Sequence, residues 1–275
     1  MKEQWLDPEN NVVITAKSIT LGEDISFGKN VSIEINGDFS IGARSQLGDN
    51  CNIKGNNVTI GKDFYNSGEL RIGGGGYNNP MSDFVIGDRC TTHNNFINIA
   101  MPVIIGDDVG LSVDVSIITH GYWLSVLDGF PAKFLGVTIN NGVIIGYRTI
   151  ILMGAIIAEK IVVGAGSVVT KPLEVLNSVY AGNPAKFIKT IKPIENKEVA
   201  LRQILENYKN VAKFHKLFPI ITINYPFVTI GDTAFNVETL EFAGPENIET
   251  DDFRDYIRKF GLRFYSDRPF KSNQP

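Results

Sequence analysis

Apolar residues recur every six positions over the middle of the chain, a spacing that fits neither a single strand nor a helix. Four positions after most of these anchors comes a small or β-branched residue, as at Val109 and Ala155. Short segments repeating in this way cannot bury their apolar faces alone and must stack on one another. The spacing therefore predicts a parallel β-helix, with inward anchors at Ile99, Ile105, Leu111, Ile117, Ile145, Ile151, Ile157, Val163 and Val169.

The same spacing extends less regularly toward the amino terminus. We interpret residues 1–18 as a lead-in, after which Leu21, Phe27 and Ile33 carry the repeat. Pairs such as Gly61-Lys62 predict coil corners, where glycine, asparagine and aspartate tolerate positive φ. The glycine run at 73–76 predicts a loop that interrupts the coils, because neither a P-loop pattern nor a helix follows it.

The repeat disappears between His120 and Gly142, over the segment HGYWLSVLDGFPAKFLGVTINNG. This excursion is too long and too aromatic for a simple corner. Long loops carried by a compact scaffold are usually functional. We therefore expect the active residues to lie where the repeat is broken.

Beyond Pro193 the pattern changes class. Apolar residues at helical spacing predict a helix over 194–217, followed by strands at 220–223 and 235–242. A second helix is predicted from Glu249 to Gly261, and a last strand over 262–266. The fold class is thus dominated by β-structure, with a β-helix domain at 1–193 and a small α+β appendage at 194–275.

Composition narrows the function classes. The formal charge is −4 and no sustained basic run occurs, so nucleic-acid binding is disfavoured. No signal peptide or membrane-spanning segment is evident, which indicates a cytoplasmic protein. The two cysteines, Cys51 and Cys90, fall in the small inward slot of the repeat, which favours buried, unpaired thiols over a disulfide or a metal role.

Three segments together resemble the hexapeptide-repeat acyltransferases of the galactoside, maltose and xenobiotic acetyltransferase type. They read IGDDVGLSVDVSIITH, then VIIGYRTIILMGAIIAEKIVVGAGSVVTK after the excursion, then AGNPAKFIK. The resemblance is good over residues 84–190 and looser back to about residue 20. It implies a left-handed β-helix, a homotrimer with sites between subunits, and acetyl-CoA or another acyl-CoA as cosubstrate, with no permanent cofactor and no metal.

His120 matches the catalytic position of that family. An alcohol or ammonium is a poor nucleophile, and neutral imidazole can remove its proton during attack on the thioester. The sequence offers no Ser or Cys as a nucleophilic partner, so we expect direct transfer in a ternary complex. This sequence departs from the family at the next residues, Gly121-Tyr122-Trp123, where proline is common.

The acceptor site is less defined. Tyr122 and Trp123 can form an aromatic wall for a sugar ring, or can anchor the excursion on a neighbouring subunit. The segment HNNFINI resembles the one that supplies an acceptor-binding asparagine in galactoside-type enzymes, and it gives Asn95 as the candidate.

For the coenzyme, the resemblance implicates Ala165, Thr170, Lys171 and Lys189. Small residues let the pantetheine arm approach the backbone, and lysines can meet its phosphates. In the family a tryptophan often stands where this chain has Ile144, so one contact surface is smaller here.

The expected function is transfer of an acetyl group to a hydroxyl of a sugar in a surface polysaccharide or its precursor. One alternative is N-acetylation of a nucleotide-linked amino sugar. Another is a noncatalytic β-helix binding protein. A three-histidine zinc enzyme on the same fold is disfavoured, because His93, His120 and His215 are too scattered in the sequence.

Overall fold

The computed structural model describes residues 2–76 and 78–269. It divides into two compact units, residues 1–192 and 193–275. The sequence-based boundary after residue 193 lies one residue from this division. Each unit has its own apolar core.

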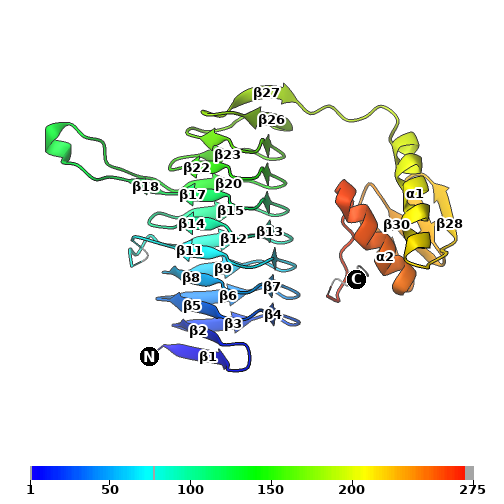
Figure 1. Cartoon of the computed structure of the whole chain (residues 1–275), viewed down its shortest axis with the longest axis horizontal. Coiled ribbons are helices and arrows are strands. Elements are labelled where there is room, and N and C mark those ends of the chain that lie inside the picture. The colour runs from blue at the N-terminus through cyan, green and yellow to red at the C-terminus, as the bar shows by residue number, and fades with distance from the viewer. Residues whose placement is uncertain (1, 77, 270–275) are drawn as a thin grey trace. The chain divides into compact units, whose positions relative to one another are not determined.

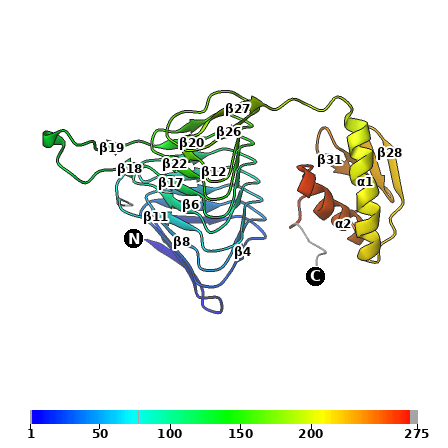
Figure 2. The ribbon, with the colours of Figure 1, turned by 45° about the horizontal axis from the view of Figure 1, so that its top comes forward.

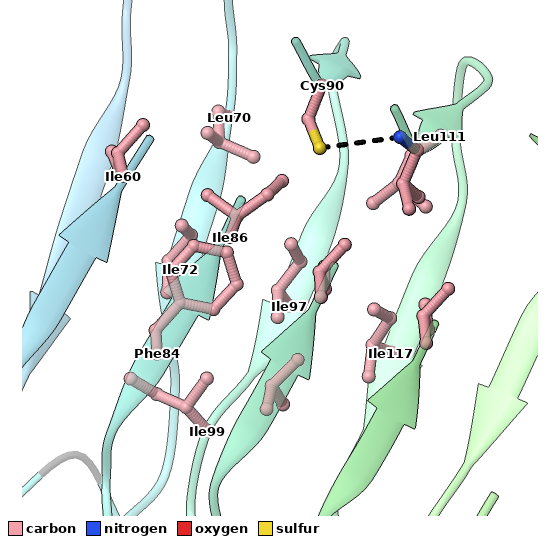
Figure 3. Close-up of a cluster of buried hydrophobic side chains, with 14 of the residues drawn as sticks. Ile60, Leu70, Ile72, Phe84, Ile86, Cys90, Ile97, Ile99, Leu111 and Ile117 are labelled. Atoms are coloured by element: carbon pink, nitrogen blue, oxygen red, sulfur yellow. Dashed lines mark hydrogen bonds between the residues drawn. The ribbon is translucent and has the colours of Figure 1, made fainter. Parts of the chain in front are cut away.

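The first unit is a stack of coils, each of which contributes one strand to each of three parallel sheets (Figure 1). We call these sheets A, B and C in the order in which a coil visits them. Equivalent inward residues lie in register, so that Ile72 pairs with Ile97 and Ile97 with Ile117. Figure 3 shows these side chains in a row across adjacent strands. The parallel β-helix predicted from the six-residue spacing is thereby confirmed.

Sheet A begins with an antiparallel hairpin at the amino-terminal end of the stack. Its strands, in spatial order, are β1 (Glu3–Asp7), β2 (Val12–Ala16), β5 (Val31–Ile35), β8 (Asn52–Gly55), β11 (Arg71–Gly73), β14 (Phe96–Asn98), β17 (Ser116–Ile118), β22 (Ile150–Leu152) and β25 (Val168–Val169).

Sheets B and C complete each coil. Sheet B contains β3 (Ser18–Leu21), β6 (Asp38–Ile41), β9 (Val58–Ile60), β12 (Phe84–Ile86), β15 (Val103–Ile105), β20 (Val137–Ile139) and β23 (Ile156–Ile157). Sheet C contains β4 (Ser26–Phe27), β7 (Gln46–Leu47), β10 (Tyr65–Asn66), β13 (Thr91–Thr92), β16 (Gly110–Leu111), β21 (Ile144–Ile145), β24 (Val162–Val163), β26 (Ser178–Ala181) and β27 (Lys186–Thr190).

The predicted lead-in over residues 1–18 is wrong. β1 and β2 form the hairpin of sheet A, and β2 already pairs in parallel with β5 as the first coil strand. The strand VVITA buries alternate residues, Val12, Ile14 and Ala16, which is the ordinary period of two. The six-residue search missed it because the position six before Leu21 is Thr15, a polar residue that does not face the core.

At the corner pairs of the Gly61-Lys62 kind, glycine serves close packing rather than positive φ. Gly61 does not have positive φ, whereas Asp63, two residues later, has φ 54°. A Cβ at Gly61 would lie 2.5 Å from the carbonyl carbon of Gly87 in the next coil. The distance between stacked coils therefore excludes a side chain at Gly61, and the residue in the left-handed conformation is Asp63.

The anchors predicted from Ile99 to Val169 are buried, and so are the two cysteines, whereas Leu21 and Phe27 near the amino-terminal end are half-buried. Both thiols are unpaired, as the sequence indicated. Within the described residues, none of the helices is long and apolar enough to cross a membrane.

Two segments leave the stack at the same corner, where the chain passes from sheet A to sheet B. We call this the A–B corner. The glycine-rich loop, described over residues 74–76 and 78–83, lies between β11 and β12, and the excursion lies between β17 and β20. The repeat resumes at Val137 rather than at Val143, because β20 buries Val137 and Ile139 in sheet B. Both views show the excursion projecting away from the coils (Figures 1 and 2).

The second unit combines two helices with a four-stranded antiparallel sheet. Its elements are α1 (Lys197–Phe214), β28 (Ile221–Asn224), β29 (Phe227–Ile230), β30 (Thr233–Asn236), β31 (Glu241–Ala243), α2 (Ile248–Ile257) and a 3-10 turn, η2 (Arg258–Phe260). The strand predicted over 235–242 is two strands joined by a turn, since Leu240 has φ 60°. The strand predicted over 262–266 is absent: these described residues are irregular, and Phe264 packs into the apolar core instead.

One strand offers a test of the inward and outward assignment. Ile86 is 1% exposed and Val85 beside it is 39% exposed. Ile86→Ala should lower the free energy of unfolding by about 2–5 kcal/mol, because it leaves a cavity between tightly stacked coils. Val85→Ala should change it by about 0.5 kcal/mol or less. Urea unfolding of both variants measures this, and equal losses would contradict the assignment.

Candidate functional site at the A–B corner

His120 lies at the A–B corner where the chain leaves β17 for the excursion. β18 (His120–Gly121) pairs antiparallel with β19 (Lys133–Phe134), so the two ends of the excursion form a short ribbon. The pairing places His120 opposite Phe134. The backbone of His120 is consequently held by a strand pair rather than by an irregular loop.

Three aromatic rings cluster at the base of this ribbon. The imidazole of His120 stacks on Phe134, with ring centroids 5.7 Å apart and an interplanar angle of 10°. Tyr122 stacks on Phe134 at 5.3 Å and lies 5.5 Å from the imidazole. Tyr122 is 57% exposed and Phe134 is 43% exposed. The half-buried imidazole of His120 therefore lies against aromatic rings that remain partly exposed to solvent.

Asn98, at the end of β14 in the preceding coil, contacts the imidazole. Its Oδ1 lies 2.8 Å from Nδ1 of His120 and accepts a hydrogen bond from the hydroxyl of Thr119 at 2.6 Å. Asn98 is only 3% exposed. The ring nitrogen Nε2 is the one that does not face Asn98, and a neutral imidazole with one nitrogen held in this way can accept a proton at the other.

The rest of the excursion is highly exposed. Trp123 is 90% exposed and lies outside the ring cluster of His120, Tyr122 and Phe134. At the tip, the 3-10 turn η1 (Val126–Asp128) is capped by the Ser125 hydroxyl, and Leu127 is 94% exposed. The structure thus brings Tyr122 to His120 and leaves Trp123 apart.

Asn95 has an internal position. It is 1% exposed, its Oδ1 accepts from the backbone nitrogen of His93, and its Nδ2 donates to the carbonyl of Ser112. Both ends of the amide are therefore satisfied by backbone at the corner between sheets C and A. Asn98, three residues later, is the asparagine that reaches His120.

The candidate coenzyme residues fall into two groups. Thr170 and Lys171 are exposed and follow β25 at the A–B corner, two coils beyond His120. The spacing of strands within a sheet puts them about 10 Å further along the stack. Ala165 lies on the turn between sheets C and A, and Lys189 lies on β27 at the edge of sheet C. Within one chain, the four residues do not form a single site.

Sequence reasoning missed Asn98 and Phe134. Ile97, Asn98 and Ile99 are all buried, so the polar residue breaks the alternation expected of a strand. An asparagine inside the apolar run FINIA was the available signal. The sequence holds no comparable signal for Phe134, because Phe134 contacts His120 only once β18 and β19 pair and close the excursion.

No cluster of three potential metal ligands occurs among residues 2–76 and 78–269. His93 lies at the corner between sheets C and A, where its Nδ1 is 2.8 Å from the Ser67 hydroxyl. His215 pairs with the Asp252 carboxylate in the second unit. The three histidines have different partners.

No family model matches the chain. It is 36% identical over 114 residues to a proposed acetyltransferase of Saccharomyces cerevisiae, covering 40% of this chain and 57% of that protein. It is 32% identical over 138 residues to the galactoside O-acetyltransferase of Escherichia coli, covering 50% of this chain and 56% of the enzyme. The chain thus spans little more than half the length of these two relatives.

Among solved structures, the polySia-specific acetyltransferase NeuO is similar over 73% of this chain and 94% of its own, at 21% identity and a TM-score of 0.49. Both sequence relatives are named as acetyltransferases, and one of them as a galactoside O-acetyltransferase, which agrees with the resemblance seen in the sequence.

The cysteines provide a test of the site assignment. Burial raises the pKa of Cys51 to about 11 and that of Cys90 to about 12. Both groups are therefore protonated as well as inaccessible near pH 8, and we expect a thiol reagent to label the folded protein only slowly. Denaturant should expose both thiols per chain. A thiol in the folded protein that reacts as fast as free cysteine would contradict the expected slow labelling and would make a cysteine nucleophile a candidate again.

Proposed function

We propose that the chain is an acyl-CoA-dependent O-acetyltransferase that uses acetyl-CoA and acts on a sugar of a surface polysaccharide or its precursor. The observation that carries the proposal is His120, fixed at the A–B corner with Nδ1 against Asn98 and its ring stacked on Phe134. The similarity to a galactoside O-acetyltransferase supports acetyl transfer to a sugar hydroxyl. The excursion and the second unit are the basis for the polysaccharide assignment.

In the proposed reaction His120 acts as a general base. Nε2 takes the proton of the acceptor hydroxyl while the oxygen attacks the thioester carbonyl and forms the new C–O bond. The C–S bond then breaks, and the imidazolium returns the proton to the departing thiolate. Atoms and charges balance without an acyl-enzyme. This agrees with the burial of Cys51 and Cys90.

We assign the ring cluster to acceptor binding. Tyr122 and Phe134 offer exposed aromatic surface beside the base. Aromatic faces pack well against the C–H surface of a pyranose, and they can hold the sugar so that one hydroxyl points at His120. Trp123 joins this wall only if the outer excursion folds toward the acceptor.

We assign Thr170 and Lys171 to the coenzyme, along the A–B corner that also carries His120. The exposed Lys171 ammonium at this corner can pair with a phosphate of the coenzyme. Ala165 and Lys189 would join the same coenzyme only from another copy of the chain. This separation supports a homotrimer with sites between subunits.

Outward-facing isoleucines of sheet B also favour self-association. Ile104 is 49% exposed and Ile156 is 52% exposed, and they flank Thr138 on the outer face of the same sheet. Exposed apolar side chains gathered on one face are typical of a subunit interface. We further propose a cytoplasmic location, where acetyl-CoA is available and where unpaired thiols persist.

Replacing His120 tests the assigned base. We expect His120→Ala to lower kcat by about 10²–10⁴-fold, the usual contribution of general base catalysis, with nearly unchanged coenzyme A binding. Release of free thiol from acetyl-CoA is measured with sugar and amino-sugar acceptors. His215→Gln, in the second unit, is the matched control and should retain activity.

The outcomes separate the alternatives. Activity of His120→Ala close to that of the unmodified protein would reject the base. A preference for amino sugars would favour N-acetylation. A protein that does not bind coenzyme A would fit a noncatalytic scaffold.

The aromatic wall has its own test. Tyr122→Ala should raise the acceptor KM roughly three- to tenfold, equivalent to about 0.5–1.5 kcal/mol of ring contact, and should leave the KM for acetyl-CoA unchanged. Tyr122→Phe retains the ring and should behave like the unmodified protein. If both variants lose acceptor binding equally, the hydroxyl rather than the ring face recognises the sugar.

A further inference from the structure

The glycine-rich loop that interrupts the coils packs directly against the corner that carries His120. Nδ2 of Asn98 donates hydrogen bonds to the carbonyl oxygen of Gly73, the last residue of β11, at 3.2 Å and to that of Gly75 in the loop at 3.3 Å. Asn98 in turn contacts the imidazole of His120. A continuous chain of hydrogen bonds therefore runs from the glycine-rich loop to the proposed base.

These partners fix the orientation of the Asn98 amide. Two carbonyl oxygens on one side require the NH2 group there, because an amide oxygen in that place would face acceptors. The opposite side must then be Oδ1. Thr119 agrees with this arrangement: its hydroxyl accepts from the backbone nitrogen of Met101 at 3.2 Å and donates its own hydrogen to Oδ1.

The fixed amide decides which nitrogen of His120 carries the proton. Oδ1 can only accept, so Nδ1 must donate to it and Nε2 must hold the lone pair when the ring is neutral. We propose that Asn98, oriented by the glycine-rich loop, is a positioning residue that holds His120 in the Nδ1–H tautomer. The inference rests on the proposed function only in taking Nε2 as the base for the acceptor.

The close contact explains the glycines of the loop. Gly74 has φ 90°, and a Cβ there would lie 3.0 Å from Nδ2 of Asn98. A Cβ at Gly76 would lie 2.9 Å from that of Ala100. At Gly75, by contrast, a Cβ would meet nothing within 4 Å, and φ is not positive. Side chains are therefore excluded at two positions that touch the corner and tolerated at the one between them.

The tautomer can be measured without substrate. Nitrogen-15 NMR of the full chain at about pH 8, above the ordinary histidine pKa near 6.5, distinguishes a protonated from an unprotonated ring nitrogen. The His120 signals are identified by their loss in His120→Ala. We expect a protonated Nδ1 and an unprotonated Nε2. The opposite tautomer, which free histidine prefers, would overturn the inference even in a fully active enzyme.

Variants then test the positioning. Asn98→Ala should shift His120 toward the Nε2–H tautomer and lower kcat by about 10–100-fold, as for other contacts that orient an imidazole, with little change in either KM. Gly74→Ala should change the tautomer in the same direction, and Gly75→Ala should leave it unchanged. Equal effects of the two alanine substitutions would reject the role of the loop.

The measurements on the unmodified protein also separate this inference from the proposed function. A correct tautomer without acetyl transfer to any acceptor would leave the hydrogen-bond chain intact and reject the activity. Acetyl transfer by a protein whose His120 is in the Nε2–H tautomer would support the activity and reject the positioning role of Asn98. Should Asn98→Ala fail to fold, the tautomer of the unmodified protein and the pair of glycine variants still decide the question.

Discussion

The stacking of coils in register is the constraint on which the rest of the first unit depends. Each inward side chain packs on its equivalents in the coils before and after it, as Ile97 does between Ile72 and Ile117. An insertion within a strand would shift every later inward residue to the outer face. Extra residues can therefore leave the stack only at a corner, and corners are where this chain carries its polar and aromatic chemistry.

The glycine-rich loop and the excursion both leave the stack at the A–B corner. They belong to the coils immediately before and after the coil that contains Asn98. This arrangement gives the buried Asn98 carbonyl partners from the end of β11 and from the glycine-rich loop, and an imidazole partner from the start of the excursion. The scaffold supplies the position, and the insertions supply the functional groups. The site thus joins segments that are separated by more than forty residues in the sequence.

The scaffold could be predicted well because the six-residue period repeats one local packing rule many times. The strand that opens the first coil was not predicted, because Val12 and Ile14 follow the two-residue period of a strand and not the six-residue period. His120 was found because the break in the repeat points to it. Asn98 and Phe134 were not, because their contacts arise from the stacking of neighbouring coils and from the closing of the ribbon, and neither leaves a spacing in the sequence.

The central claim is that the break at His120 creates an acetyl-transfer site along the A–B corner. A crystal structure of the protein with bound coenzyme A tests it most directly. The claim predicts the coenzyme thiol near Nε2 of His120, within about 3–4 Å, with the pantetheine arm following the corner toward Lys171. A coenzyme whose thiol lies at another corner, away from the imidazole, would contradict it.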